Sequence, residues 1–162
     1  MSVFRIIAAL LISLIAAGFT ACGEEDDSNP PDKSQNQGYD GQDPKASGCD
    51  IPAPTDVPRT TVPVKLPDGK VLGQLDLRRS SSCQTMWGRV SGLPQVLIGG
   101  NVMHVNAVRP RDGAAAPFQT TDVYIAVFGD MLTFRTGCVY AEAYVVRKGK
   151  QGPKARTPCR MG

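Results

Sequence analysis

Beyond residue 44, the apolar residues occur in short runs that alternate with polar residues, and Gly, Pro and Asp separate these runs. Such period-2 alternation is typical of half-buried strands, and no long 3.6-residue period follows residue 21. We therefore predict strands at 61–66, 70–79, 84–91, 102–108, 122–128, 131–135 and 138–147. The expected fold is all-β, a small antiparallel sandwich or barrel without a long helix.

Two of these runs carry further detail. The Asp68-Gly69 step predicts a tight hairpin between the first two strands. In the second strand, alternation assigns Val71, Leu75 and Leu77 to a buried face, and Gln74, Asp76 and Arg78 to an exposed face. The run 123–128 is apolar on both faces and predicts a central strand covered on each side, followed by a turn at Asp130.

Residues 1–21 have the pattern of an export signal. Arg5 precedes an apolar stretch from Ile6 to Phe19, and Cys22 and four acidic residues follow soon after. The apolar stretch is shorter than the roughly 20 residues that span a bilayer. An uncleaved transmembrane anchor is the alternative.

The end of this segment, Phe19-Thr20-Ala21-Cys22, resembles the bacterial lipobox, in which the cysteine thiol receives a diacylglyceryl group before cleavage. Phe19 departs from the usual aliphatic residue. The resemblance predicts a protein that is exported and held at the outer face of the cytoplasmic membrane by diacylglyceryl-Cys22. An ordinary cleaved signal, which would give a secreted protein, is the second alternative.

The chain has five cysteines, an odd number for an exported protein. With Cys22 as the lipid carrier, Cys49, Cys83, Cys138 and Cys159 remain, which predicts two disulfides in an oxidising compartment. The residues alone leave three pairings open. None of these cysteines belongs to a C-x-x-C motif, so we expect neither a zinc site nor another cofactor.

Residues 22–43 form a polar segment that predicts a disordered acidic tether, and residues 44–162 form the folded domain. Residues 23–47 contain no Val, Ile, Leu, Phe, Met or Trp, although residues from about Gly38 are expected to dock on the domain. Residues 23–43 carry seven acids and one lysine, a net charge of −6, whereas residues 44–162 carry 16 basic and eight acidic residues, a net charge of +8.

The positive charge of the domain is concentrated near its C-terminus. No acid follows Glu142, whereas six basic residues do: Arg147, Lys148, Lys150, Lys154, Arg156 and Arg160. This asymmetry predicts attraction to an anionic partner, such as a cell-wall polymer or a membrane protein. A solvated basic tail is the alternative. The predicted compartment and the lack of a recognition motif argue against nucleic acid.

Several segments resemble a bacterial secreted family, domain of unknown function 2690. They are Gly41-Gln42-Asp43-Pro44, Gly48-Cys49, Leu75-Asp76-Leu77-Arg78-Arg79-Ser80, Cys83 and Trp87-Gly88-Arg89-Val90. The similarity extends over about residues 38–145. This chain lacks the family's cysteine pair before Gly-x-Asp-Pro and has Arg79 where the family has Tyr.

The resemblance implies a shared bridge between Cys49 and Cys83. Cys138 and Cys159 would then form a bridge of this protein's own, which closes the basic C-terminal segment onto the last strand. The family's activity is unknown. Its occurrence as the outer module of membrane-anchored helix-turn-helix proteins implies sensing or binding.

Catalytic patterns are weak. A Ser-His-Asp mechanism requires the single histidine, His104, together with Ser80, Ser81 or Ser82, and no G-x-S-x-G turn is present. A carboxylate pair for glycoside hydrolysis would come from Asp76, Asp122, Asp130 and Glu142. We expect no enzyme.

Aromatic residues provide a further candidate surface. Trp87 and Arg89 share one strand face, and Tyr140 and Tyr144 share another on either side of Glu142. An exposed ring beside a guanidinium binds sugars or peptides. The interpretation that we favour instead places Trp87 in the core, with Arg89 over its edge. The candidate binding surface therefore comprises Trp87, Arg89, Arg147, Lys148, Lys150, Lys154 and Arg156.

The leading hypothesis is a cell-surface lipoprotein that binds an anionic envelope component or a partner protein without catalysis. A disulfide-braced protease inhibitor is the second hypothesis, and a cell-wall hydrolase is the third.

Overall fold

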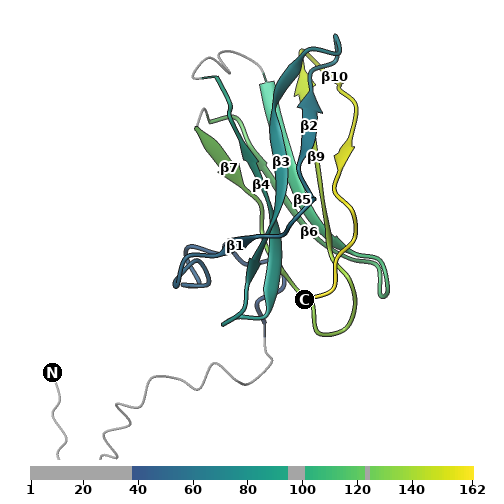
Figure 1. Ribbon diagram of the computed structural model, residues 1–162. Helices are drawn as coiled ribbons and strands as arrows, with labels where there is room; N and C mark the ends of the chain where they lie inside the picture. Colours follow the sequence, from purple (N-terminus) through teal and green to yellow (C-terminus); the bar gives the residue numbers. More distant parts are fainter. Residues whose placement is uncertain (1–37, 95–100, 123–124) are drawn as a thin grey trace, which may run out of the picture. The chain divides into compact units, whose positions relative to one another are not determined.

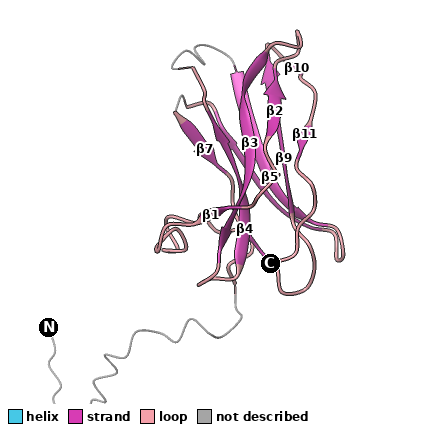
Figure 2. Ribbon diagram, viewed as in Figure 1, coloured by secondary structure: helices cyan, strands magenta, loops and turns pink. Residues whose placement is uncertain are grey.

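The computed structural model describes residues 38–94, 101–122 and 125–162, which form two packed antiparallel sheets (Figures 1 and 2). The sheets are joined by the core and braced by disulfides Cys49–Cys83 and Cys138–Cys159. The predicted all-β sandwich and both bridges are therefore confirmed. The described residues include no helix long and apolar enough to span a membrane.

Sheet A has two long central strands, β3 (Val71–Ser80) and β4 (Thr85–Ser91). Its edges consist of short strands, namely β1 (Thr55–Asp56) and β2 (Val62–Lys65) beside β3, and β7 (Ala126–Phe128) and β8 (Leu132–Thr133) beside β4. The hairpin predicted at Asp68-Gly69 joins β2 to β3, and Gly69 has φ 85° there, a conformation that favours glycine.

Sheet B is built around β5 (Asn101–Arg109) and β9 (Tyr140–Arg147). Strand β6 (Ala114–Thr120) forms one edge, and β10 (Lys150–Gln151) and β11 (Ala155–Arg156) form the other. The link between β10 and β11 packs on β2, because a Cβ on Gly152 would lie 2.7 Å from the Lys65 carbonyl oxygen. The sandwich is therefore closed on this side.

The main core lies between the sheets and is rich in small residues. Leucines and valines of β3 and β4 meet Val105, Ala107, Ala141 and Ala143 of sheet B. The sheets come closest at Gly88, where a Cβ would lie 2.8 Å from Val105 Cγ1. Because alanine and glycine fill little space, the two sheets approach each other closely without large aromatic side chains.

A second, smaller core covers the outer face of sheet A. Trp87, which is 0% exposed, packs with Cys49, Cys83 and Met131. The N-terminal residues of the domain cover it, with Tyr39 against this cluster and Gly41 N donating to Met131 O at 2.9 Å. Residues 38–43 are thus part of the fold, in agreement with the expected docking from about Gly38, and the fold begins before the predicted boundary at residue 44.

Three predictions about individual strands were wrong. Val71 is 50% exposed, because the β2–β3 pairing shifts between Val64 and Lys65 and moves Val71 out of the alternation that buries Leu75. Asp76 is buried rather than exposed, since Arg89 and Thr61 bond its carboxylate. Among the described residues of the strand predicted at 122–128, only Ala126–Phe128 form a strand, and this strand lies at an edge of sheet A rather than at its centre.

The lipobox with Cys22, the signal and most of the tether lie outside the described residues, as do Val123 and Tyr124.

Candidate functional site

One end of the sandwich carries a concentration of positive charge. The β2–β3 and β9–β10 turns lie together at this end, the upper end in Figure 1. They carry one acid, Asp68, and five basic residues, which we call the basic pole: Lys65, Lys70, Arg147, Lys148 and Lys150. The acid compensates little of this charge, because Arg147 Nη1 and Asp68 Oδ2 are 3.9 Å apart and both side chains are about half exposed.

The surface of the basic pole is hollowed. A depression of about 340 Å³ is lined by Pro67 and Asp68 of one turn and by Arg147, Lys148 and Lys150 of the other. The cations therefore surround a concave surface, where their fields add. An anion in this depression would meet three basic side chains at once.

The β9–β10 turn holds its basic residues in an unusual backbone conformation. Arg147 pairs with Lys150, so the turn itself is Lys148-Gly149, with φ 50° and 74°. Positive φ at both positions is the pattern of a type I′ turn, in which Asn-Gly is favoured. A lysine in the left-handed region costs about 1 kcal/mol relative to glycine. Lys148 therefore occupies a position where its side chain does not favour the backbone conformation.

The basic pole lies far from the point where the N-terminal residues join the domain. Asp40 bonds Thr133 N, Thr133 pairs with Thr85, and Thr85 pairs with Ser80, the last residue of β3. The basic pole instead adjoins Val71, the first residue of β3. At roughly 3.3 Å per residue, a ten-residue strand separates the two ends by about 30 Å.

Lys154 and Arg156 lie on the outer face of sheet B. Both bond Glu142 at 2.8 Å, and Glu142 is only 5% exposed. Burial acts to raise the pKa of Glu142, but the hydrogen bonds and charges of the two cations outweigh burial and lower it. The Glu142 carboxylate therefore stays ionised and neutralises part of the positive charge of Lys154 and Arg156. The cations of the basic pole have no such buried carboxylate among the described residues.

The rings on the same face are covered by protein groups. His104 stacks on Tyr144, with centroids 4.4 Å apart, and Lys154 Nζ lies 5.3 Å from the Tyr144 centroid. Arg156 covers Tyr140 at 4.6 Å. Burial lowers the pKa of His104, which favours the neutral imidazole. The two tyrosines therefore do not offer the open stacking platform that the sequence suggested.

Trp87 and Arg89 do not belong to the basic surface. Trp87 lies in the second core, as the favoured interpretation placed it, so its inclusion in the candidate binding surface was wrong. Arg89 lies on the outer face of sheet A, where Nη2 is 3.1 Å from Asp76 and 3.3 Å from Asp56. Its charge is used to hold β1 on the sheet.

The candidate catalytic residues do not converge. His104 is on the outer face of sheet B, whereas Ser80 ends β3 in sheet A, with the core between them. Asp76 and Glu142 likewise lie on opposite sheets, each bonded to cations. Asp130 lies in a loop, where burial and the nearby carboxylate of Asp43 raise its pKa. In the described ranges, no three metal-ligating side chains gather.

The sequence prediction missed Lys65 and Lys70. The signal that could have found them is the predicted hairpin itself, because residues on either side of a tight turn are close neighbours. Nothing in the pattern indicated that this hairpin meets the β9–β10 turn, because the two are far apart in the sequence.

Comparison with protein-family models, with curated proteins and with solved structures finds no match for this chain. Membership of the family that the motifs resemble therefore stays a prediction. The two disulfides that the resemblance implied are nevertheless those of the structure.

Proposed function

We propose that this protein is a non-enzymatic surface lipoprotein, anchored through Cys22 outside the cytoplasmic membrane, whose basic pole binds an anionic polymer of the cell envelope. The observation that carries the proposal is the basic pole itself, where a single acid accompanies five basic residues, three of which, Arg147, Lys148 and Lys150, line a concave surface. Its position at the end of the domain remote from Asp40 supports contact with the envelope rather than with the anchoring bilayer.

The thiols support the location. Two disulfides account for four of the five cysteines, which leaves Cys22 for the lipid. The intact mass of native protein from a membrane fraction tests this assignment. The expected mass includes a diacylglyceryl adduct on Cys22 and lacks four thiol protons. Cytosolic protein with its initial methionine and free thiols throughout would refute it.

Binding is tested with cell walls that carry an anionic phosphodiester polymer and with the same walls after its removal. We expect the intact protein to cosediment only with the untreated walls, and 0.5 M salt to release it, because charges this exposed are screened over a few ångströms at that ionic strength, about 4 Å. Binding that is insensitive to salt would contradict the electrostatic account.

A pair of matched variants locates the site. Lys148→Gln with Lys150→Gln is expected to weaken binding about threefold to tenfold, because two exposed charges are lost. Arg111→Gln with Arg135→Gln makes the same charge change elsewhere on the domain, among residues that bond Thr136 and Gln84. Equal losses in both variants would indicate net charge rather than the basic pole.

One observation favours a second candidate, a protease inhibitor. Ile51 is 74% exposed, two residues after the disulfide-bonded Cys49, as expected of a braced loop that enters an enzyme's cleft. A panel of extracellular proteases tests this function. Inhibition that disappears in Ile51→Ala would support it, and no inhibition at micromolar protein would dismiss it.

A further inference from the structure

The side of the sandwich opposite the closed edge exposes a short strand, β7. Gly129 N donates to Gly88 O at 2.9 Å, and the register places Val127 opposite Val90 and Phe128 opposite Arg89. In an antiparallel pair, successive residues alternately direct their main-chain N–H and C=O groups toward the neighbouring strand and away from it. Since Gly129 bonds β4, Val127 also directs its main-chain groups to β4. The N–H and C=O groups of Ala126 and Phe128 therefore point away from β4, toward an edge of sheet A at which no further strand pairs within the described ranges.

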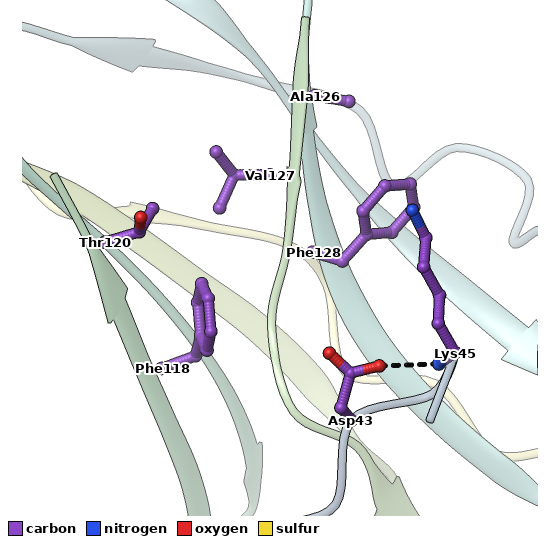
Figure 3. A pocket seen from close by; sticks show the side chains of 7 residues that line it. All are labelled: Asp43, Lys45, Phe118, Thr120, Ala126, Val127 and Phe128. Atoms are coloured by element: carbon purple, nitrogen blue, oxygen red, sulfur yellow. Dashed lines mark hydrogen bonds between the residues drawn. The ribbon is translucent and has the colours of Figure 1, made fainter. Parts of the chain in front are cut away.

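A groove of about 310 Å³ surrounds this edge (Figure 3). Val127 projects to the side where Phe118 and Thr120 of β6 lie, whereas Phe128 and Lys45 lie on the other side of the strand. Ile125, which precedes β7, is 74% exposed. These main-chain groups thus run between a wall lined by Phe118 and a wall that carries the Lys45 cation. The Asp43 carboxylate also lines the groove, where its Oδ1 accepts hydrogen bonds from the main-chain N–H groups of Lys45 and Ala46.

Residues 41–42 of the chain already pair with Met131, which follows β7 on the same edge of sheet A. Gly41 N donates to Met131 O at 2.9 Å, and Met131 N donates to Gln42 O at 3.0 Å, so residues 41–42 pair beside the segment that follows β7. The chain then turns away, because Asp43 Oδ1 accepts hydrogen bonds from the N–H groups of Lys45 and Ala46. Among the described residues, this strand-like pairing stops short of Phe128.

We propose that the edge of β7 binds an extended peptide segment of a partner protein, which continues the pairing begun by residues 41–42. Added strands gain affinity from main-chain hydrogen bonds and specificity from alternate side chains. The peptide residue opposite Val127 enters the side of the groove lined by Phe118, and is therefore apolar.

The residues flanking this apolar position lie on the side of Phe128 and Lys45. Lys45 Nζ is 4.5 Å from the Phe128 centroid and forms no ion pair with the described residues. Acidic residues at the flanking positions complement its charge. The proposed partner segment therefore has an apolar residue opposite Val127 and an acidic residue on each side of it. The neighbouring edge strand β6 is unsuited to such pairing, because Pro117 removes a main-chain donor from it.

The probe is the peptide acetyl-Ser-Glu-Val-Glu-Ser-amide, titrated into the intact protein and followed by NMR. We expect the amide signals of Ala126 and Phe128 to shift and their hydrogen exchange to slow, because both N–H groups gain acceptors. Methylating the main-chain nitrogen of both glutamates is expected to abolish binding. Lys45→Gln is expected to weaken it about threefold to tenfold.

Ala126→Pro removes an edge donor that β4 does not use, so the domain is expected to fold and binding to be lost. Ala115→Pro on the edge of β6 is the matched control, expected to leave binding intact. If Ala126→Pro fails to fold, the N-methylated peptide decides the question alone. Equal binding of the methylated peptide, no shift at millimolar peptide, or a concentration-dependent dimer through β7 without peptide would each overturn the proposal.

Discussion

The guanidinium of Arg109 lies 2.8 Å from the carboxylate of Asp40 and so joins two residues that are 69 positions apart in the chain. Arg109 also bonds Asp112 and Thr133, and its side chain is 7% exposed. The N-terminal residues of the domain, a hairpin of sheet B and strand β8 therefore meet at one cation. Because Asp40 also accepts from Thr133 N, it links the two sheets.

Asp40→Asn is expected to lower the free energy of unfolding by about 1–2 kcal/mol, because the charge-assisted bond to Arg109 becomes a neutral one while Asp112 still balances the cation. Urea unfolding of the two proteins at neutral pH measures the difference. Because the segment 39–50 covers Trp87, hydrogen exchange near Gly41 should also accelerate in the variant. Unchanged stability would show that Asp112 alone satisfies Arg109.

Glu142 should make stability depend on acid pH. The cations lower its pKa in the folded protein, so its contribution is full above the ordinary glutamate value and is lost as pH falls through the lowered folded value. The folded protein should therefore lose stability below about pH 4.5. In Glu142→Gln, stability at pH 7 should fall by about 1–3 kcal/mol, and this part of the acid-induced loss should disappear.

Thermal unfolding of both proteins between about pH 3 and pH 7 tests this assignment. Asp40 and Asp112, whose pKa values are also lowered, keep their own acid dependence in the variant. The informative quantity is therefore the difference between the two pH profiles. A constant difference across the range would mean that Glu142 stabilises the fold without its charge.

The packing at Gly88 predicts a cost for a single methyl group. Gly88→Ala should destabilise the protein by about 1–3 kcal/mol, because its Cβ would lie 2.8 Å from Val105 Cγ1 and 3.0 Å from the Ala141 Cβ. Val105→Ala removes the closer obstacle. The double variant should therefore be destabilised by less than the sum of the single variants in urea unfolding. If the destabilisation of the double variant equals the sum of the single destabilisations, the sheets accommodate the added methyl group by moving apart and not through the space at residue 105.

The sequence predicted most of the sandwich because alternation is a local signal. Strand β5 carries it most clearly, because its residues alternate between buried and half-buried from Met103 to Arg109. Strand β6 was missed, since its sequence Ala-Ala-Ala-Pro-Phe-Gln-Thr has weak strand propensity and a proline that only an edge accepts. The two-residue strands β1, β10 and β11 are too short to show any period.

The candidate site was predictable only in part. The C-terminal cations were identified by their charge alone, but their separation into the basic pole and the pair on Glu142 depends on how β10 and β11 pair with β9. Trp87 illustrates the same limit. Alternation gave its strand face correctly, whereas its burial depends on the distant segment 39–50, whose docking was expected but whose position over Trp87 no local pattern indicated.

Lys148 offers the sharpest test of the basic pole, because its backbone conformation and its charge lead to opposite expectations. Its φ of 50° in a two-residue turn before Gly149 is a position where asparagine is preferred. Lys148→Asn should therefore raise the free energy of unfolding by up to about 1 kcal/mol. The same substitution removes one cation from the basic pole and should weaken binding to the anionic polymer by about twofold to fivefold. Urea unfolding and wall cosedimentation of one variant measure both quantities. A variant that is more stable yet binds equally well would show that the Lys148 charge does not contribute to binding. It would then contradict the assignment of the binding site to the basic pole.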